Sequence, residues 1–267
     1  MMRAFRAELV KLLRRRVLLV TALVTLVFSA GAALVVLASA PAVAGSGGRG
    51  GDGRGGPTLE SLAGAGGGTE VFTTAVAFAG TLVFVVFVGM VAAEFSRGTV
   101  RTMLLRQPGR LRLLGGKMGA VLAFAGAALA TAEARTWVWA RLLAPSQDLS
   151  TSQWMSWQGL GHGLMDYGKV MFWVTCYAAL ATAVGVLVRS VPVALAVGIA
   201  WAGPFEHLVQ EAWAPATRLF PGLLLEAFVA GGTPEVGAVR ASLTVAAYAA
   251  AAAVVACAVF ARRDVTP

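Results

Sequence analysis

Six apolar stretches divide this chain, and most of them are long enough to cross a lipid bilayer. They cover about residues 17–38, 71–93, 118–136, 170–188, 191–204 and 241–261. A transmembrane helix needs roughly 17–25 mainly apolar residues, so only the fifth stretch is short, and Pro204 is expected to bend or end it. The chain is 58% hydrophobic and 13% charged, whereas soluble domains are roughly 45–50% apolar and about 25% charged. We therefore predict an all-α integral membrane protein, a single domain over residues 1–267 with six transmembrane helices.

The distribution of charge predicts how these helices are oriented. Four segments hold 15 of the 22 Lys and Arg residues: the N-terminus, residues 94–117, the short link at Arg189 and the C-terminus. Cytoplasmic segments of membrane proteins are rich in Lys and Arg, and six spans place all four segments on one side. We expect a multi-pass protein of the bacterial cytoplasmic (inner) membrane with both termini in the cytoplasm. The net charge of +9 then reflects topology and attraction to anionic membrane lipid, and we expect no nucleic-acid partner.

Residues 3–16 predict an amphipathic helix that lies on the membrane surface. Its apolar side chains share one helical face: Phe5, Leu9, Leu12 and Leu13. A cleaved export signal is the alternative, because Arg15-Arg16 resembles a twin-arginine motif and Ala38-Ser39-Ala40 resembles a signal-peptidase site. The apolar run after Arg16 is longer than the roughly 7–15 residues of a signal peptide, and cleavage would spoil the charge pattern. We therefore expect the first span to be retained.

The segment at residues 94–117 is the most distinctive polar part of the chain. It carries six Lys and Arg residues and one acidic residue between two apolar stretches. Its first half, Glu94 to Gln107, has a helix-like pattern that Pro108-Gly109 is expected to stop. A compact, basic, helical segment between two spans offers a cytoplasmic surface that a soluble partner can bind.

The connections on the opposite side differ from one another. The stretch from Pro41 to Gly68 is rich in glycine, which predicts a flexible loop. Residues 205–239 are more apolar than a solvated loop, but Leu219–Val229 is too short to span a membrane. We expect a re-entrant outer hairpin that turns at Pro221-Gly222. The alternative is an ordinary amphipathic surface helix.

Charged residues lie toward the ends of the apolar stretches. Glu133 is about 24 Å along a helix from Lys117, so Glu133 and Arg135 are expected near the outer interface. There they could snorkel or pair, or alternatively line an outer exit route. The middle thirds of all six stretches contain no Asp, Glu, Lys, Arg or His, whereas ion-coupled transporters usually need such charged groups near the midplane. Energy for uphill transport would then have to come from a partner.

The chain has few residues that could bind a metal or act in catalysis. The two histidines, His162 and His207, have no metal-ligand spacing, either with each other or with a cysteine. Cys176 and Cys257 fall inside apolar stretches and are interpreted as small apolar residues. We expect no metal site and no enzyme activity in this chain.

A phosphate-binding loop is also absent from the sequence. Gly116-Lys117 resembles the end of such a loop, but Leu111 stands where the first glycine is required. Met118 replaces the Ser or Thr that would hold magnesium. We expect no cofactor bound by this chain, and any ATP hydrolysis belongs to a partner.

In their order along the chain, these features resemble the ABC-2 type permease, the transmembrane subunit of bacterial ABC exporters. The resemblance covers essentially the whole length. It rests on the basic start, on the pattern E-x-x-x-G-T-x-R-x-x-L-x-x-x-P-x-R from Glu94 to Arg110, on Arg189-Ser190, and on the closing residues 260–266. The polar Glu133-Ala-Arg135 is a departure, because the family is usually apolar at the end of the third span.

The resemblance implies roles for particular residues. The N-terminal helix would be a connecting helix, and the segment before the last span would form re-entrant outer helices. The helix after the second span would be a coupling helix that docks into a groove of an ABC ATP-binding subunit. The residues at or near that contact would be Glu94, Arg97, Gly98, Thr99, Arg101, Leu104 and Pro108. Arg110 and Lys117 would anchor the return to the membrane.

The same resemblance implies an assembly and a function. Two permeases, identical or paralogous, would join two ATP-binding subunits that hold ATP and magnesium. Together they would export an amphipathic or hydrophobic cargo such as an antibiotic, a lipid or a peptide, as in multidrug or antibiotic efflux. Two other classes remain open. One is an ATP-independent facilitator or secondary transporter, and the other is a membrane scaffold or sensor that holds a different cytoplasmic partner.

Overall fold

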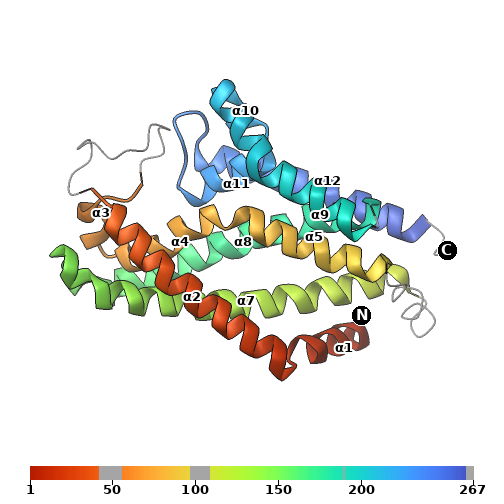
Figure 1. Ribbon diagram of the computed structural model, residues 1–267, viewed down its shortest axis with the longest axis horizontal. Coiled ribbons are helices and arrows are strands. Elements are labelled where there is room, and N and C mark those ends of the chain that lie inside the picture. The colour runs from red at the N-terminus through yellow and green to blue at the C-terminus, as the bar shows by residue number, and fades with distance from the viewer. Residues whose placement is uncertain (42–55, 97–108, 189, 263–267) are drawn as a thin grey trace.

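The computed structural model describes residues 1–41, 56–96, 109–188 and 190–262, and these residues form helices and no β-strand (Figure 1). The longer helices are α1 (Met2–Leu12), α2 (Arg15–Ser39), α4 (Gly67–Phe78), α5 (Gly80–Ser96), α7 (Arg110–Leu143), α8 (Trp157–Val188), α9 (Val191–Ala200), α11 (Pro221–Val229) and α12 (Ala238–Arg262). Shorter turns connect them: α3 (Leu59–Ala63), η1 (Ala144–Gln147), η2 (Ser152–Met155), η3 (Trp201–Phe205), α10 (Glu206–Ala212) and η4 (Ala214–Arg218). The prediction of an all-α protein is confirmed.

Several helices are long and apolar enough to cross a membrane. They are α2, α7, α8 and α12, and α4 with α5 form one more if the bent pair is counted as a single span. On α2, Leu19, Val20, Leu23 and Val24 are each 59–61% exposed. Exposing so much apolar surface along a whole helix to water is unfavourable, whereas contact of that surface with lipid is not. The chain is a multi-pass membrane protein.

Helix α8 lies at the centre of the bundle. It packs against α4, α5, α7, α9, α11 and α12. Val170, Trp173 and Ala181 on this helix are fully buried. Helices α2 and α7 run side by side, and both termini lie at the same end of the bundle (Figure 1).

The second span is bent, although the sequence predicts one continuous helix over residues 71–93. Helices α4 and α5 meet at an angle of 58°. At the joint, a Cβ atom on Gly80 would lie 2.8 Å from the Tyr177 hydroxyl and 3.3 Å from the Trp173 ring. The missing side chain lets the bent span approach α8 closely at this point.

The third and fourth spans are longer than predicted. Helix α7 has 34 residues, about 51 Å at about 1.5 Å per residue, rather than residues 118–136. No Gly or Pro occurs between Gly126 and Pro145, so nothing stops the helix. Its first eight residues, 110–117, come from the segment assigned to the cytoplasm. Glu133 therefore lies ten residues before the helix ends, and not at its outer end.

The fifth stretch and the segment after it form a set of short helices. Helix α9 has 10 residues, too few to span a bilayer alone. A π-helical turn at Trp201–Phe205 contains Pro204, which cannot donate the regular backbone hydrogen bond. Helix α11 begins at Pro221, a favoured first position. Six of its nine residues are buried, so α11 packs into the bundle.

Candidate functional site

Three helices are joined by buried charges at the end of the bundle that holds the termini. The Lys117 ammonium on α7 binds Glu94 near the end of α5, and its Nζ lies 3.0 Å from Glu8 Oε1 on α1. Glu8 and Lys117 are only 8% and 7% exposed. Lys11 adds an ion pair to Glu8 at 2.9 Å. We refer to Glu8, Glu94 and Lys117 as the interhelical ion-pair network.

Glu8 is held in its charged form within this network. Burial alone would raise the pKa of Glu8. Hydrogen bonds from Lys11 and Lys117, together with their positive charges, outweigh burial and hold that pKa below its ordinary value. The carboxylate is therefore ionised at neutral pH. Removing its cations would leave a buried charge without compensation.

Helix α1 lies on α7 at two glycines. A Cβ atom at Gly116 would be 2.6 Å from the Met1 carbonyl oxygen and 2.9 Å from Ala4 Cβ. A Cβ atom at Gly119 would be 3.5 Å from the Phe5 ring. Residues three apart share a helical face, so this glycine face brings the backbone of α1 close enough for Glu8 to reach Lys117.

The predicted coupling residues are only partly visible in the described structure. Glu94 and Lys117 form an ion pair with each other, although they stand at opposite ends of the 94–117 segment in the sequence. Arg110 instead donates to the carbonyl oxygens of Phe260 and Ala261, at 3.5 and 3.1 Å, at the end of α12. The remaining residues assigned to the ATPase contact lie outside the described residues: Arg97, Gly98, Thr99, Arg101, Leu104 and Pro108.

Glu133 and Arg135 do not form one polar group, because they point to different neighbours. Arg135 donates to the Ala22 carbonyl at 2.8 Å and to Thr25 Oγ1 at 2.6 Å, both on α2. Glu133 is 9% exposed and faces α8, with Oε1 3.8 Å from the Cβ position of Gly163. Arg135 therefore bonds α7 to α2, whereas Glu133 lies against α8.

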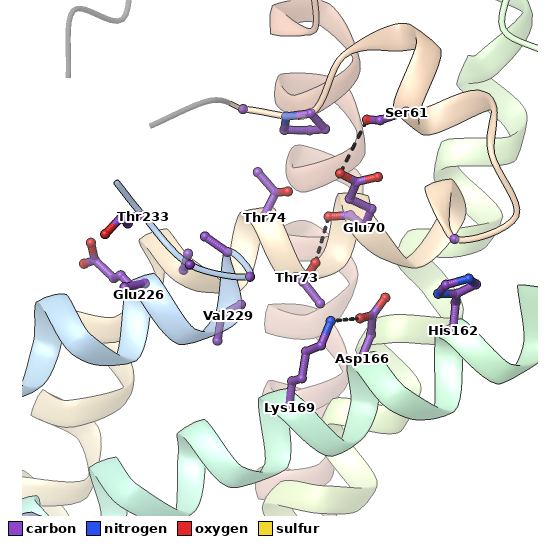
Figure 2. A pocket seen from close by; sticks show the side chains of 18 of the residues that line it. Ser61, Glu70, Thr73, Thr74, His162, Asp166, Lys169, Glu226, Val229 and Thr233 are labelled. Carbon is purple, nitrogen blue, oxygen red and sulfur yellow. Dashed lines mark hydrogen bonds and ion pairs between the residues drawn. The ribbon is translucent and has the colours of Figure 1, made fainter. Parts of the chain in front are cut away.

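A polar cavity of about 580 Å³ lies among α4, α8 and α11 (Figure 2). Its walls come from the connection between α3 and α4, from α4, α8 and α11, and from the loop that follows α11. Four charged side chains line it: Glu70, Asp166, Lys169 and Glu226. We call this space the polar cavity.

The carboxylates of the polar cavity differ in their partners. Asp166 accepts from Lys169 Nζ at 2.8 Å and from Thr69 Oγ1 at 2.7 Å. Glu226 lies 3.2 Å from His207 Nε2. Among the described residues, Glu70 accepts a side-chain hydrogen bond from Ser61 alone, at 3.4 Å (Figure 2). Glu70 is thus the carboxylate with the weakest compensation.

Glu206 fixes the start of α11 beside this cavity. It is 1% exposed, and its Oε2 accepts a hydrogen bond from the Leu223 backbone nitrogen at 3.0 Å. The carboxylate thereby satisfies one of the free N–H groups of the first turn. Burial, aided by the charge of Glu226 and opposed by the hydrogen bond from Leu223, raises the pKa of Glu206 to about 7.

Glu206→Gln is expected to change the pH dependence of thermal stability. The folded pKa of Glu206 exceeds its unfolded value, so unfolding releases a proton between about pH 4.5 and pH 7, and the contribution of Glu206 falls as pH rises through this window. Glutamine keeps an acceptor for Leu223 but cannot ionise. Its melting temperature relative to the wild type should increase by about 3 °C or more between pH 5 and pH 8. Unfolding in detergent, followed by labelling of the buried Cys176 with a thiol-reactive dye, measures this difference. A difference that stays constant with pH would contradict the assignment.

Sequence reasoning missed Glu8, Glu70, Asp166 and Glu226 as site residues. For Glu8 a signal existed: it lies between Ala4 and Leu12 at four-residue spacing, so it falls on the buried face of a helix that is otherwise basic. The three cavity residues come from distant parts of the chain. Only packing of α4, α8 and α11 brings them together.

Comparison with known proteins identifies a family for this chain but no biochemical activity. Residues 52–266 match a family described as "Protein of unknown function (DUF2705)". No curated protein matches the chain. The matched region begins before α3 and includes the helices that carry Glu94, Lys117 and the polar cavity, so the function has to be argued from these residues.

Proposed function

The chain belongs to the DUF2705 family, and from that premise we propose that it is the permease subunit of an ATP-driven ABC exporter. In this role it forms the translocation path for an amphipathic or hydrophobic cargo and hydrolyses no ATP itself. Two copies, or one copy and a paralogue, pair with two ATP-binding subunits that hold ATP and magnesium. The resemblance of residues 94–117 to the coupling segment of ABC-2 type permeases is the starting point.

The interhelical ion-pair network is the observation that carries the proposal. A permease driven by a separate ATPase needs a cytoplasmic segment whose movement reaches several spans. Lys117 joins both flanks of the 94–117 segment, α5 and α7, to the N-terminal helix α1. Arg110 adds α12 through its last carbonyl groups. A force applied to the segment would therefore be shared by four helices.

The proposed mechanism is mechanical. ATP binding closes the partner subunits, and the docked 94–117 segment moves with them. Because Lys117 binds both Glu94 and Glu8, α1, α5 and α7 shift together and do not slide past one another. The interface between the two permeases then opens toward the outside.

The proposed topology places the basic end of the bundle in the cytoplasm of a bacterial cell. The five spans from α2, α4–α5, α7, α8 and α12 then need one more crossing to bring both termini to one side. The fifth apolar stretch, residues 191–204, supplies it as a short span made of α9 and the π-helical turn that follows. Helices α10 and α11 would form the re-entrant outer hairpin.

Purification from native membranes tests the proposed function. Tagged protein extracted in mild detergent should bring down a stoichiometric ATP-binding subunit and show ATP hydrolysis. Scrambling the order of residues 97–107 should remove that subunit and the activity while membrane insertion persists, because charge and composition are unchanged. The matched control scrambles residues 45–54, on the predicted outer side, and should leave the complex intact.

Other outcomes would replace the proposal. Without an ATP-binding partner, a stable complex with another cytoplasmic protein favours a scaffold or sensor. Transport by the purified chain alone, driven by an ion gradient, favours a secondary transporter. An ATP-binding partner that binds equally well after residues 97–107 are scrambled would remove the coupling role from this segment.

A further inference from the structure

The polar cavity has the size and lining of a small-molecule site. Its volume of about 580 Å³ lies within the roughly 300–1,000 Å³ of ligand pockets. Apolar surface comes from Ala77 on α4 and from Leu223 and Val229 on α11. The hydroxyl groups of Thr73 and Thr74 on α4 and the charged side chains add polar atoms to the lining. Such a mixed lining suits an amphipathic ligand.

The charge of the lining is negative. Three carboxylates and one lysine line the cavity, and the lysine is already paired with Asp166 at 2.8 Å (Figure 2). Glu70 has only the Ser61 hydroxyl as a side-chain hydrogen-bond partner among the described residues, although the charge of Lys169 also acts on it. A partly enclosed carboxylate with so weak a partner favours a positively charged ligand, because charge-assisted hydrogen bonds are the stronger ones.

We propose that the polar cavity binds an organic cation with an apolar body, whose positive charge lies at Glu70 and whose apolar part contacts α4 and α11. Glu226 and Asp166 add to the negative potential on the other walls. The cation could be a free molecule or the headgroup of a zwitterionic lipid. As a cargo site the cavity rests on the proposed function, but binding by this chain alone does not require an ATPase partner.

Binding of ethidium, a fluorescent organic cation, tests the inference on the purified full chain in maltoside micelles. The wild type should bind ethidium saturably. Glu70→Gln, which keeps the side-chain volume, should weaken binding about tenfold by removing the charge-assisted contact. The matched control is Glu60→Gln, since Glu60 is an exposed carboxylate on α3 that does not line the cavity. Its affinity should equal that of the wild type.

Further measurements distinguish binding of ethidium in the cavity from its adsorption to the protein or micelle, and they identify the source of the cation. Thr74→Trp should fill the cavity and abolish binding, and the anionic dye 1-anilinonaphthalene-8-sulfonate should gain affinity in Glu70→Gln. Competition by added phosphatidylcholine would support a lipid headgroup as the ligand, and its absence a free cation. The inference would be overturned if Glu60→Gln and Glu70→Gln weakened ethidium binding equally, or if Thr74→Trp left ethidium binding unchanged. Such a failure would leave the ATPase pull-down unaffected, so the two proposals fail separately.

Discussion

Replacing Lys117 by methionine is expected to destabilise the fold by about 3 kcal/mol or more, because breaking a buried ion pair leaves an uncompensated charge. Lys117 is the shared cation of Glu8 and Glu94, and its side chain is 9% exposed. Methionine has a similar length but donates no hydrogen bond. A chain of this size loses roughly 2–4 °C of melting temperature per kcal/mol, so we expect a fall of about 6 °C or more, measured through Cys176 labelling in detergent.

Two further variants distinguish a lost ion pair from a general effect of substitution. Lys11→Met removes an ion pair to the same Glu8, but the Lys11 side chain is 43% exposed, so a loss of at most about 1 kcal/mol is expected. The triple variant Glu8→Gln, Glu94→Gln, Lys117→Met removes all three charges of the network and should recover most of the stability. If Lys117→Met melts at the wild-type temperature, the network does not hold the three helices together.

The class of the protein could be predicted from its sequence because bilayer thickness imposes a length on apolar runs. The stretches at 17–38 and 241–261 correspond closely to α2 and α12, which begin and end within a few residues of them. Both helices have largely lipid-facing surfaces, so hydropathy alone determines them.

Helix boundaries inside the bundle could not be predicted in this way. The first 13 residues of α8, 157–169, mix polar and apolar residues and contain four glycines, which locally favour a loop. Tertiary packing overrides this preference. A Cβ atom on Gly159 would lie 2.4 Å from the Trp154 carbonyl oxygen and 3.0 Å from that of Ala65, so glycine is what lets the start of α8 fit against these segments.

The candidate sites, too, could be predicted only where a local sequence pattern marks them and not where they depend on helix packing. Glu94 and Lys117 could be singled out because they begin and end a basic segment between two apolar runs. Their bond to each other and to Glu8 depends on how α1 crosses α7, which no local pattern encodes. Likewise, the midplane of each apolar stretch is uncharged, but Glu70, Asp166 and Glu226 meet only after three helices pack around the polar cavity.

Gly116→Leu is expected to lift α1 from α7, because even a Cβ atom at this position would lie 2.6 Å from the Met1 carbonyl oxygen and 2.9 Å from Ala4 Cβ. Backbone and a Cβ atom cannot rotate aside, so the helix itself has to move. A leucine is a strong helix former, so α7 should persist. Movement of α1 would also separate Glu8 from Lys117.

The neighbouring Gly115 provides the matched control, because a Cβ atom there would meet nothing within 4 Å. A cysteine at position 4, where Ala4 is 8% exposed, reports on the contact when Cys176 and Cys257 are replaced by alanine. In the Ala4→Cys background, Gly116→Leu should raise the maleimide labelling rate at position 4 about tenfold, which corresponds to about 1.4 kcal/mol in the opening equilibrium. Gly115→Leu should leave the rate unchanged. Equal labelling rates in both variants would mean that α1 is not held on the glycine face of α7. The proposal that movement of the 94–117 segment is transmitted to α1 would then be wrong as well.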